Sequence, residues 1–162
     1  MGPMDLSKWA FLEDDDDEGQ ACFAEASELR EQANALAHHA HGKEPSERQK
    51  SLREAVSMYC RAVELLKTSR LPASAPAREL GLHCRLNAAC LALEAASIPT
   101  PGAQGQKQAQ QAEKTSERLA LEALELDPKN PHAALLLARL SADQRAAWLA
   151  LAKSWASERQ DQ

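Results

Sequence analysis

The amino-acid sequence predicts an all-α fold, and three features of its composition carry this prediction. The 162 residues include 32 alanines and 23 leucines, which are strong helix formers. Only two valines and one isoleucine are present, and aromatic residues make up 4% of the chain. Because strands need β-branched and aromatic side chains to cover a pleated surface, a sheet protein is excluded. The length suits one domain, which at this size buries roughly 70% of its unfolded-chain surface.

Apolar residues that recur every three or four positions predict six helices. We expect the first three helices at about 20–41, 46–68 and 77–97. The fourth is expected to end at Leu126, the fifth to begin at Pro131, and the sixth to end at about Arg159. The segments 69–76 and 98–105 are expected as a connector and a loop, because both are rich in proline or glycine.

Helix starts and buried faces can also be predicted. Ser46 with Gln49, and Ser141 with Gln144, have the spacing of a capping box. Pro131 after Asn130 occupies the favoured first position of a helix. In the third helix, the inward face is expected to carry Leu80, His83, Leu86, Cys90 and Leu93.

The net charge of −5 is unevenly distributed along the chain. Residues 1–20 hold seven acidic residues and one lysine, whereas the remainder holds seventeen acidic residues and eighteen lysines and arginines. A block of like charges is typical of disordered tails, so we expect a disordered acidic tail at 1–19 and a helical domain at 20–159. Trp9 and Phe11 leave open that this tail docks on a partner or folds back on the domain.

Several functional classes are not expected. The body lacks the strongly basic balance of a nucleic-acid binder, and no run reaches the ~20 apolar residues of a membrane span. We therefore expect a soluble protein in the cytoplasm or the nucleus. Enzyme motifs such as the phosphate-binding glycine loop are absent, so neither catalysis nor a cofactor is expected.

Cysteine and histidine give no metal site in this sequence. The four cysteines form no CxxC pair and lie within helical patterns, which predicts buried free thiols in a reducing compartment. His38, His39 and His41 lack the further ligands that tetrahedral zinc requires. We expect this histidine cluster to be a solvated helix end.

Small residues are spaced in a way that suggests stacked helical hairpins. Ala55, Tyr59 and Ala62 follow one another at steps of four and three, and Ala120 and Ala123 repeat the second step. Small side chains at this spacing allow a neighbouring helix to approach closely. Six helices in pairs therefore predict three closely stacked hairpins.

Three strings carry a resemblance to a known family. They are Leu-Arg-Glu-Gln-Ala-Asn-Ala-Leu at 29–36, Arg-Leu-Asn-Ala-Ala-Cys-Leu-Ala-Leu at 85–93 and Ala-Leu-Glu-Leu-Asp-Pro-Lys-Asn at 123–130. With them, the chain resembles a tetratricopeptide (TPR) domain with long loops, most closely the three-repeat domains of co-chaperones and immunophilins. The resemblance implies an α-α superhelix whose first helices line a concave groove for a partner peptide or helix.

The resemblance also implies a partial carboxylate clamp, in which several donors converge on a peptide carboxylate. Arg30 and Asn34 fall where the family has lysine and asparagine, Arg85 or the nearby Asn87 falls at the second asparagine, and His132 replaces a second lysine. Leu136 stands where the family has arginine, and Arg139 is three residues away. The implied partner is the acidic C-terminal peptide of a heat-shock chaperone.

Other interpretations stay open at this point. Arg30, Asn34 and His132 could be solvated helix residues. The protein could instead be a scaffold or assembly subunit that uses apolar helix faces and binds no carboxylate. Trp148 and Trp155 either cap the last repeat or form an exposed patch for association. We expect a monomer or a weak homodimer.

Overall fold

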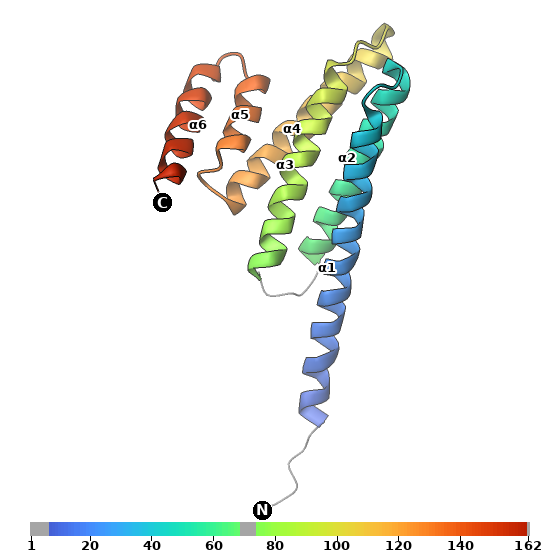
Figure 1. Ribbon diagram of the computed structural model, residues 1–162, viewed down its shortest axis with the longest axis vertical. Coiled ribbons are helices and arrows are strands. Elements are labelled where there is room, and N and C mark those ends of the chain that lie inside the picture. The colour runs from blue at the N-terminus through green and yellow to red at the C-terminus, as the bar shows by residue number, and fades with distance from the viewer. Residues whose placement is uncertain (1–6, 69–73, 162) are drawn as a thin grey trace, which may run out of the picture.

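The computed structural model describes residues 7–68 and 74–161, with side chains from residue 18 onward, and confirms the all-α prediction. Residues 1–6, 69–73 and 162 lie outside the described part. The described residues form six helices and no strand (Figure 1). The helices are α1 (Ser7–Ala40), α2 (Pro45–Thr68), α3 (Ala75–Ser97), α4 (Gly102–Leu126), α5 (Pro131–Leu140) and α6 (Arg145–Gln160).

The helices pair as antiparallel hairpins, α1 with α2, α3 with α4 and α5 with α6 (Figure 1). Each helix also packs on the next along the chain, so α2 contacts α3 and α4 contacts α5. In addition, α1 contacts α3 and α3 contacts α5, whereas the second helices make no such contacts among the described residues. The first helices of the three hairpins therefore lie next to one another in one layer.

Alanine permits the close packing between these helices. Ala55, Ala62, Ala120 and Ala123 are fully buried, which confirms their predicted place in the interface. At one such approach, the Oγ of buried Ser116 on α4 donates a hydrogen bond to the carbonyl oxygen of Ala89 on α3 at 2.7 Å. The core is thus built from many small side chains.

The first predicted capping box is wrong. α2 already begins at Pro45, before Ser46. Gln49 is buried, donates to the carbonyl oxygen of Ala95 at 3.1 Å and accepts a hydrogen bond from the Thr100 hydroxyl at 3.1 Å. Its amide ties the start of α2 to the α3–α4 loop, a long-range role that local spacing cannot reveal.

The later helix starts follow the prediction more closely. Asn130 caps α5 by accepting from the backbone N–H of Ala133 at 3.0 Å, with Pro131 at the first position. Ser141 accepts from the backbone N–H of Gln144 at 3.3 Å, yet α6 begins only at Arg145.

The α3–α4 loop is shorter than predicted, because α4 begins at Gly102. Gly102 has a φ of +89°, a conformation that favours glycine. A Cβ on Gly105 would lie 2.4 Å from the Thr100 carbonyl oxygen. Only glycine therefore lets the first turn of α4 pack against the preceding loop.

α1 begins well before the predicted start near residue 20. Its helix runs from Ser7 through residues 13–18, which hold most of the acidic residues of the predicted tail. In Figure 1 these N-terminal turns extend past the ends of the neighbouring helices. None of the helices in the described residues is both long and apolar enough to cross a bilayer.

Candidate peptide-binding groove

A groove of about 570 Å³ lies between α3 and α5. Each of these helices lines it with residues at positions i, i+3, i+4 and i+7, which share one helix face. The lining residues are Leu82, His83, Leu86, Asn87 and Cys90 on α3, His132, Leu135, Leu136 and Arg139 on α5, and Asn130 and Arg159. Both helices are first helices of their hairpins, so the groove lies in the layer that they form.

The α3 side of the groove corrects the predicted inward face of that helix. Leu80 and Leu93 are buried as predicted, but His83 and Cys90 are exposed and line the groove with Leu86. Cys90 is therefore not the buried thiol that the sequence indicated. α3 is apolar on two stripes, and its own sequence does not reveal which stripe meets the core.

Cationic side chains stand around the groove. Arg139 is exposed and has no ion pair within the described part of the chain. Exposed His83 and His132 add imidazole nitrogens that can form hydrogen bonds with a ligand. Arg159 pairs with a carboxylate oxygen of Asp127. No described residue that lines the groove is an aspartate or a glutamate.

The Arg159–Asp127 pair fixes the end of α6 at the rim of the groove. Burial raises the pKa of Asp127, but hydrogen bonds from Asn130 and Arg159 outweigh this effect and hold the pKa below its usual 3.8. Nearby, Lys129 pairs with Glu158 at 2.7 Å. Two ion pairs thus connect the last turn of α6 to the α4–α5 turn.

Two of the predicted binding residues are linked through a tyrosine. The hydroxyl of Tyr59 on α2 donates a hydrogen bond to Oδ1 of Asn34 on α1, and Nδ2 of Asn87 on α3 donates to that hydroxyl at 3.4 Å. The side chain of Tyr59 is buried. Because Asn87 also lines the groove, this bridge connects α1 to the groove wall.

Arg30 lies beside this bridge on α1. Its Nε is buried without a hydrogen-bond partner in the described part of the structure, and its Nη2 is 3.9 Å from Glu31. Burial raises the pKa of the Cys84 thiol to about 11, and the charges of Arg30 and Arg85 oppose this rise. The guanidinium of Arg30 therefore keeps free hydrogen-bonding capacity next to the core.

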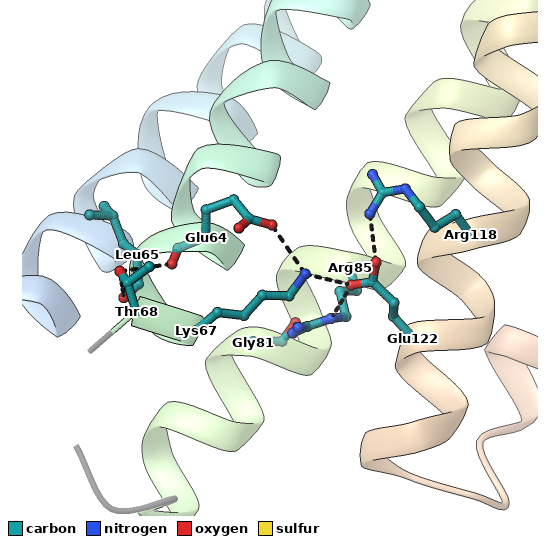
Figure 2. Close-up of polar contacts among 8 residues, drawn as sticks. All are labelled: Glu64, Leu65, Lys67, Thr68, Gly81, Arg85, Arg118 and Glu122. Atoms are coloured by element: carbon teal, nitrogen blue, oxygen red, sulfur yellow. Dashed lines mark hydrogen bonds and ion pairs between the residues drawn. The ribbon is translucent and has the colours of Figure 1, made fainter. Parts of the chain in front are cut away.

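Arg85 is placed differently from the other predicted binding residues (Figure 2). Its side chain is 9% exposed and donates to Glu122 at 3.1 Å and to the Gly81 carbonyl oxygen at 3.0 Å. Glu122 on α4 also pairs with Arg118 at 2.5 Å and Lys67 at 3.3 Å. Arg85 thus contributes to a junction of α2, α3 and α4, outside the set of groove residues.

The charge of Glu122 is stabilised at this junction. Burial raises its pKa, but hydrogen bonds from Arg118, Arg85 and Lys67 outweigh burial, so the pKa lies below its usual 4.5. The carboxylate is therefore ionised at neutral pH, and its negative charge balances the positive charge of the buried Arg85 guanidinium.

Of the predicted binding residues, Asn87 and His132 line the groove, and Asn34 on α1 is linked to Asn87 through Tyr59. Arg30 lies on α1 near Tyr59 and Cys84, and Arg85 is at the junction. Sequence reasoning missed the roles of His83 and Arg159 as lining residues. His83 could have been found from the shared i, i+3, i+4, i+7 spacing on α3 and α5. Arg159 could not, because it reaches the groove only through the folding of α6 against the α4–α5 turn.

His38, His39 and His41 are exposed at the C-terminal end of α1. The rings of His38 and His39 meet edge to face at 5.9 Å between centroids. Nowhere in the described part of the chain do three or more histidine, cysteine or acidic side chains gather closely enough to hold a metal ion.

Comparison with known proteins gives no relative: no family model, no curated protein and no solved structure matches this chain. The resemblance to tetratricopeptide domains therefore stays a prediction from the sequence strings.

Proposed function

We propose that this protein is an interaction module, an adaptor that binds an acidic peptide segment of a partner protein in the α3–α5 groove. The observation that carries the proposal is the lining of that groove. Arg139, Arg159, His83 and His132 surround it with no acidic side chain among its described lining residues. Its volume of about 570 Å³ is in the usual range of ligand pockets.

Binding would combine apolar and ionic contacts. Leu86 is partly buried and Leu135 is 43% exposed, so both can bury apolar side chains of a ligand. Arg139 would donate charge-assisted hydrogen bonds to a carboxylate of the ligand, since it forms no ion pair with any described residue. A peptide that alternates leucines with acidic residues would satisfy both kinds of contact.

A more specific form of the proposal is a co-chaperone-like TPR domain in the cytoplasm whose ligand is the acidic C-terminus of a heat-shock chaperone. It is supported by the sequence strings and by the layer of first helices that α1, α3 and α5 form. Leu136 cannot donate to a carboxylate and is 7% exposed. In this form, Arg139 supplies the guanidinium, and Arg30, Asn34 and Asn87 extend the polar row toward α1.

The test is a titration with a fluorescent synthetic peptide whose last residues are acidic and follow two leucines. Arg139→Glu should weaken binding by about 10- to 100-fold, since each 1.4 kcal/mol corresponds to a factor of ten. Lys107→Glu is the matched control, because it makes the same charge change at an exposed position on α4 outside the groove. No binding at millimolar peptide, or equal loss in both variants, would contradict the proposal.

A second candidate function is a scaffold subunit that associates through apolar helix faces. It rests on Leu149 and Leu151 of α6, which are 38% and 40% exposed. Light scattering of Leu149→Asp distinguishes the two candidates. A molecular mass that rises with concentration for the wild type but not for Leu149→Asp, together with no peptide binding, would favour the scaffold.

A further inference from the structure

We propose that the groove also binds a second copy of this chain, through the acidic N-terminal part of α1, so that copies associate head to tail. This inference rests on the proposed function, since it uses the same groove. It adds a named occupant, residues 9–18 of another copy.

Charge complementarity is the first argument. Residues 9–18 contain six acidic residues and no lysine or arginine. They follow Trp9, Phe11 and Leu12, so the segment combines apolar and acidic residues in the way the groove combines leucines with Arg139. The body as a whole is nearly neutral, and in this groove Arg139 has no ion pair among the described residues while no described lining residue is acidic.

The course of α1 is the second argument, and it favours another copy over the same copy. α1 is one uninterrupted helix from Ser7 to Ala40. A helix rises about 1.5 Å per residue, so its first turns are carried well beyond the hairpins, as Figure 1 shows. Bringing residues 9–18 back to the groove of their own chain would require unwinding this helix. A second molecule meets no such barrier.

The arrangement of charges along the helix is the third argument. Asp14, Asp15, Asp16 and Asp17 are consecutive, so this part of the chain concentrates negative charge. Like charges this close repel one another and destabilise a lone helix. A cationic groove would relieve this repulsion, so docking and helix stability would reinforce each other.

The geometry of such a contact is heterologous, because the segment and the groove are different surfaces of the molecule. Heterologous contacts propagate into chains or rings of several copies instead of stopping at a symmetric dimer. The contact would also occupy the groove, so self-association and binding of a partner peptide would compete.

The experiment is analytical ultracentrifugation of the full chain from micromolar to sub-millimolar concentration. The wild type should form species larger than a dimer. Raising the ionic strength from about 0.1 M to about 1 M should dissociate them, since the Debye length falls from roughly 10 Å to 3 Å. Replacing the four aspartates at 14–17 by asparagine, or Arg139 by glutamate, should each weaken association by about tenfold or more. Lys107→Glu should leave it unchanged.

Mixing the two weakened variants is the decisive step. The asparagine variant keeps a working groove and the Arg139→Glu variant keeps a working acidic segment, so the mixture should form a one-to-one dimer and nothing larger. Wild type that stays monomeric, association that ignores both changes, or a mixture that remains monomeric would each overturn the inference.

Titration of the asparagine variant with the synthetic acidic peptide separates this inference from the proposed function. If that variant binds the peptide while the wild type does not associate, only the head-to-tail contact is wrong. If the peptide does not bind either, the groove itself is not a peptide site.

Discussion

Arg85 on α3 lies with its Nε 3.1 Å from the Glu122 carboxylate on α4, and the two side chains are 9% and 19% exposed. This pair distinguishes Arg85 from Arg139, the arginine that we propose binds the acidic peptide. Arg85 is buried and its charge is balanced by Glu122, whereas Arg139 is exposed and has no ion pair among the described residues.

The first prediction concerns the two ends of this pair. Arg85→Met should lower the free energy of unfolding by about 1–2 kcal/mol, because Glu122 keeps Lys67 and Arg118 as partners. Glu122→Gln should cost more, about 3 kcal/mol, because it leaves the guanidinium of Arg85 buried without a counter-charge. Urea unfolding measures both values. Equal peptide affinity in Arg85→Met and wild type is expected as well, and a large loss of affinity would place Arg85 in the binding site after all.

The second prediction concerns pH. The pKa of Glu122 in the folded state lies below 4.5, and that of Asp127 lies below 3.8. As the pH falls through these values, the unfolded chain takes up protons before the folded one does. Stability should therefore be fully present above about pH 5 and should decline as the pH falls toward the folded-state pKa values. Unfolding curves between neutral and acidic pH test this, and Glu122→Gln should show a weaker dependence than wild type.

The third prediction concerns the bridge between Asn34 and Asn87. Tyr59→Phe removes only the hydroxyl and should lower the free energy of unfolding by about 1 kcal/mol, since both asparagines are exposed and can bind water instead. In a double-mutant cycle, Asn34→Ala should lower the free energy of unfolding by less in the Tyr59→Phe variant than in the wild type. Strictly additive losses would show that the hydrogen bond contributes nothing.

The fourth prediction concerns the start of α4. Gly105→Ala would place a Cβ 2.4 Å from the Thr100 carbonyl oxygen, so the loop must move, and we expect a loss of about 1–3 kcal/mol. Ala103→Ser is the control, because this residue is exposed in the same turn and should change stability by less than about 0.5 kcal/mol. Thermal unfolding compares the two. A neutral Gly105→Ala would mean that the loop is not held tightly against the helix.

The sequence was sufficient to predict the helices but not the surfaces that they form. Composition and periodicity predicted an all-α fold of six helices, and the buried alanines at 55, 62, 120 and 123 were predicted from spacing alone. Gln49 was misjudged and the ion pair of Arg85 was not predicted, since their partners lie 46 and 37 residues away in the sequence. His83 and Cys90 were misjudged because α3 has two apolar stripes, and only the position of α5 decides which one lines a groove.

The cysteines provide the most direct measurement of the central claim, that acidic peptide binds between α3 and α5. Cys90 is exposed and lines the groove, whereas Cys84 is buried with a pKa raised by burial to about 11. Alkylation followed by mass spectrometry should therefore modify Cys90 first and Cys84 last in the free protein. With saturating synthetic acidic peptide, alkylation of Cys90 should slow by about tenfold or more while half-buried Cys22 keeps its rate. An unchanged rate at Cys90 would contradict binding in this groove.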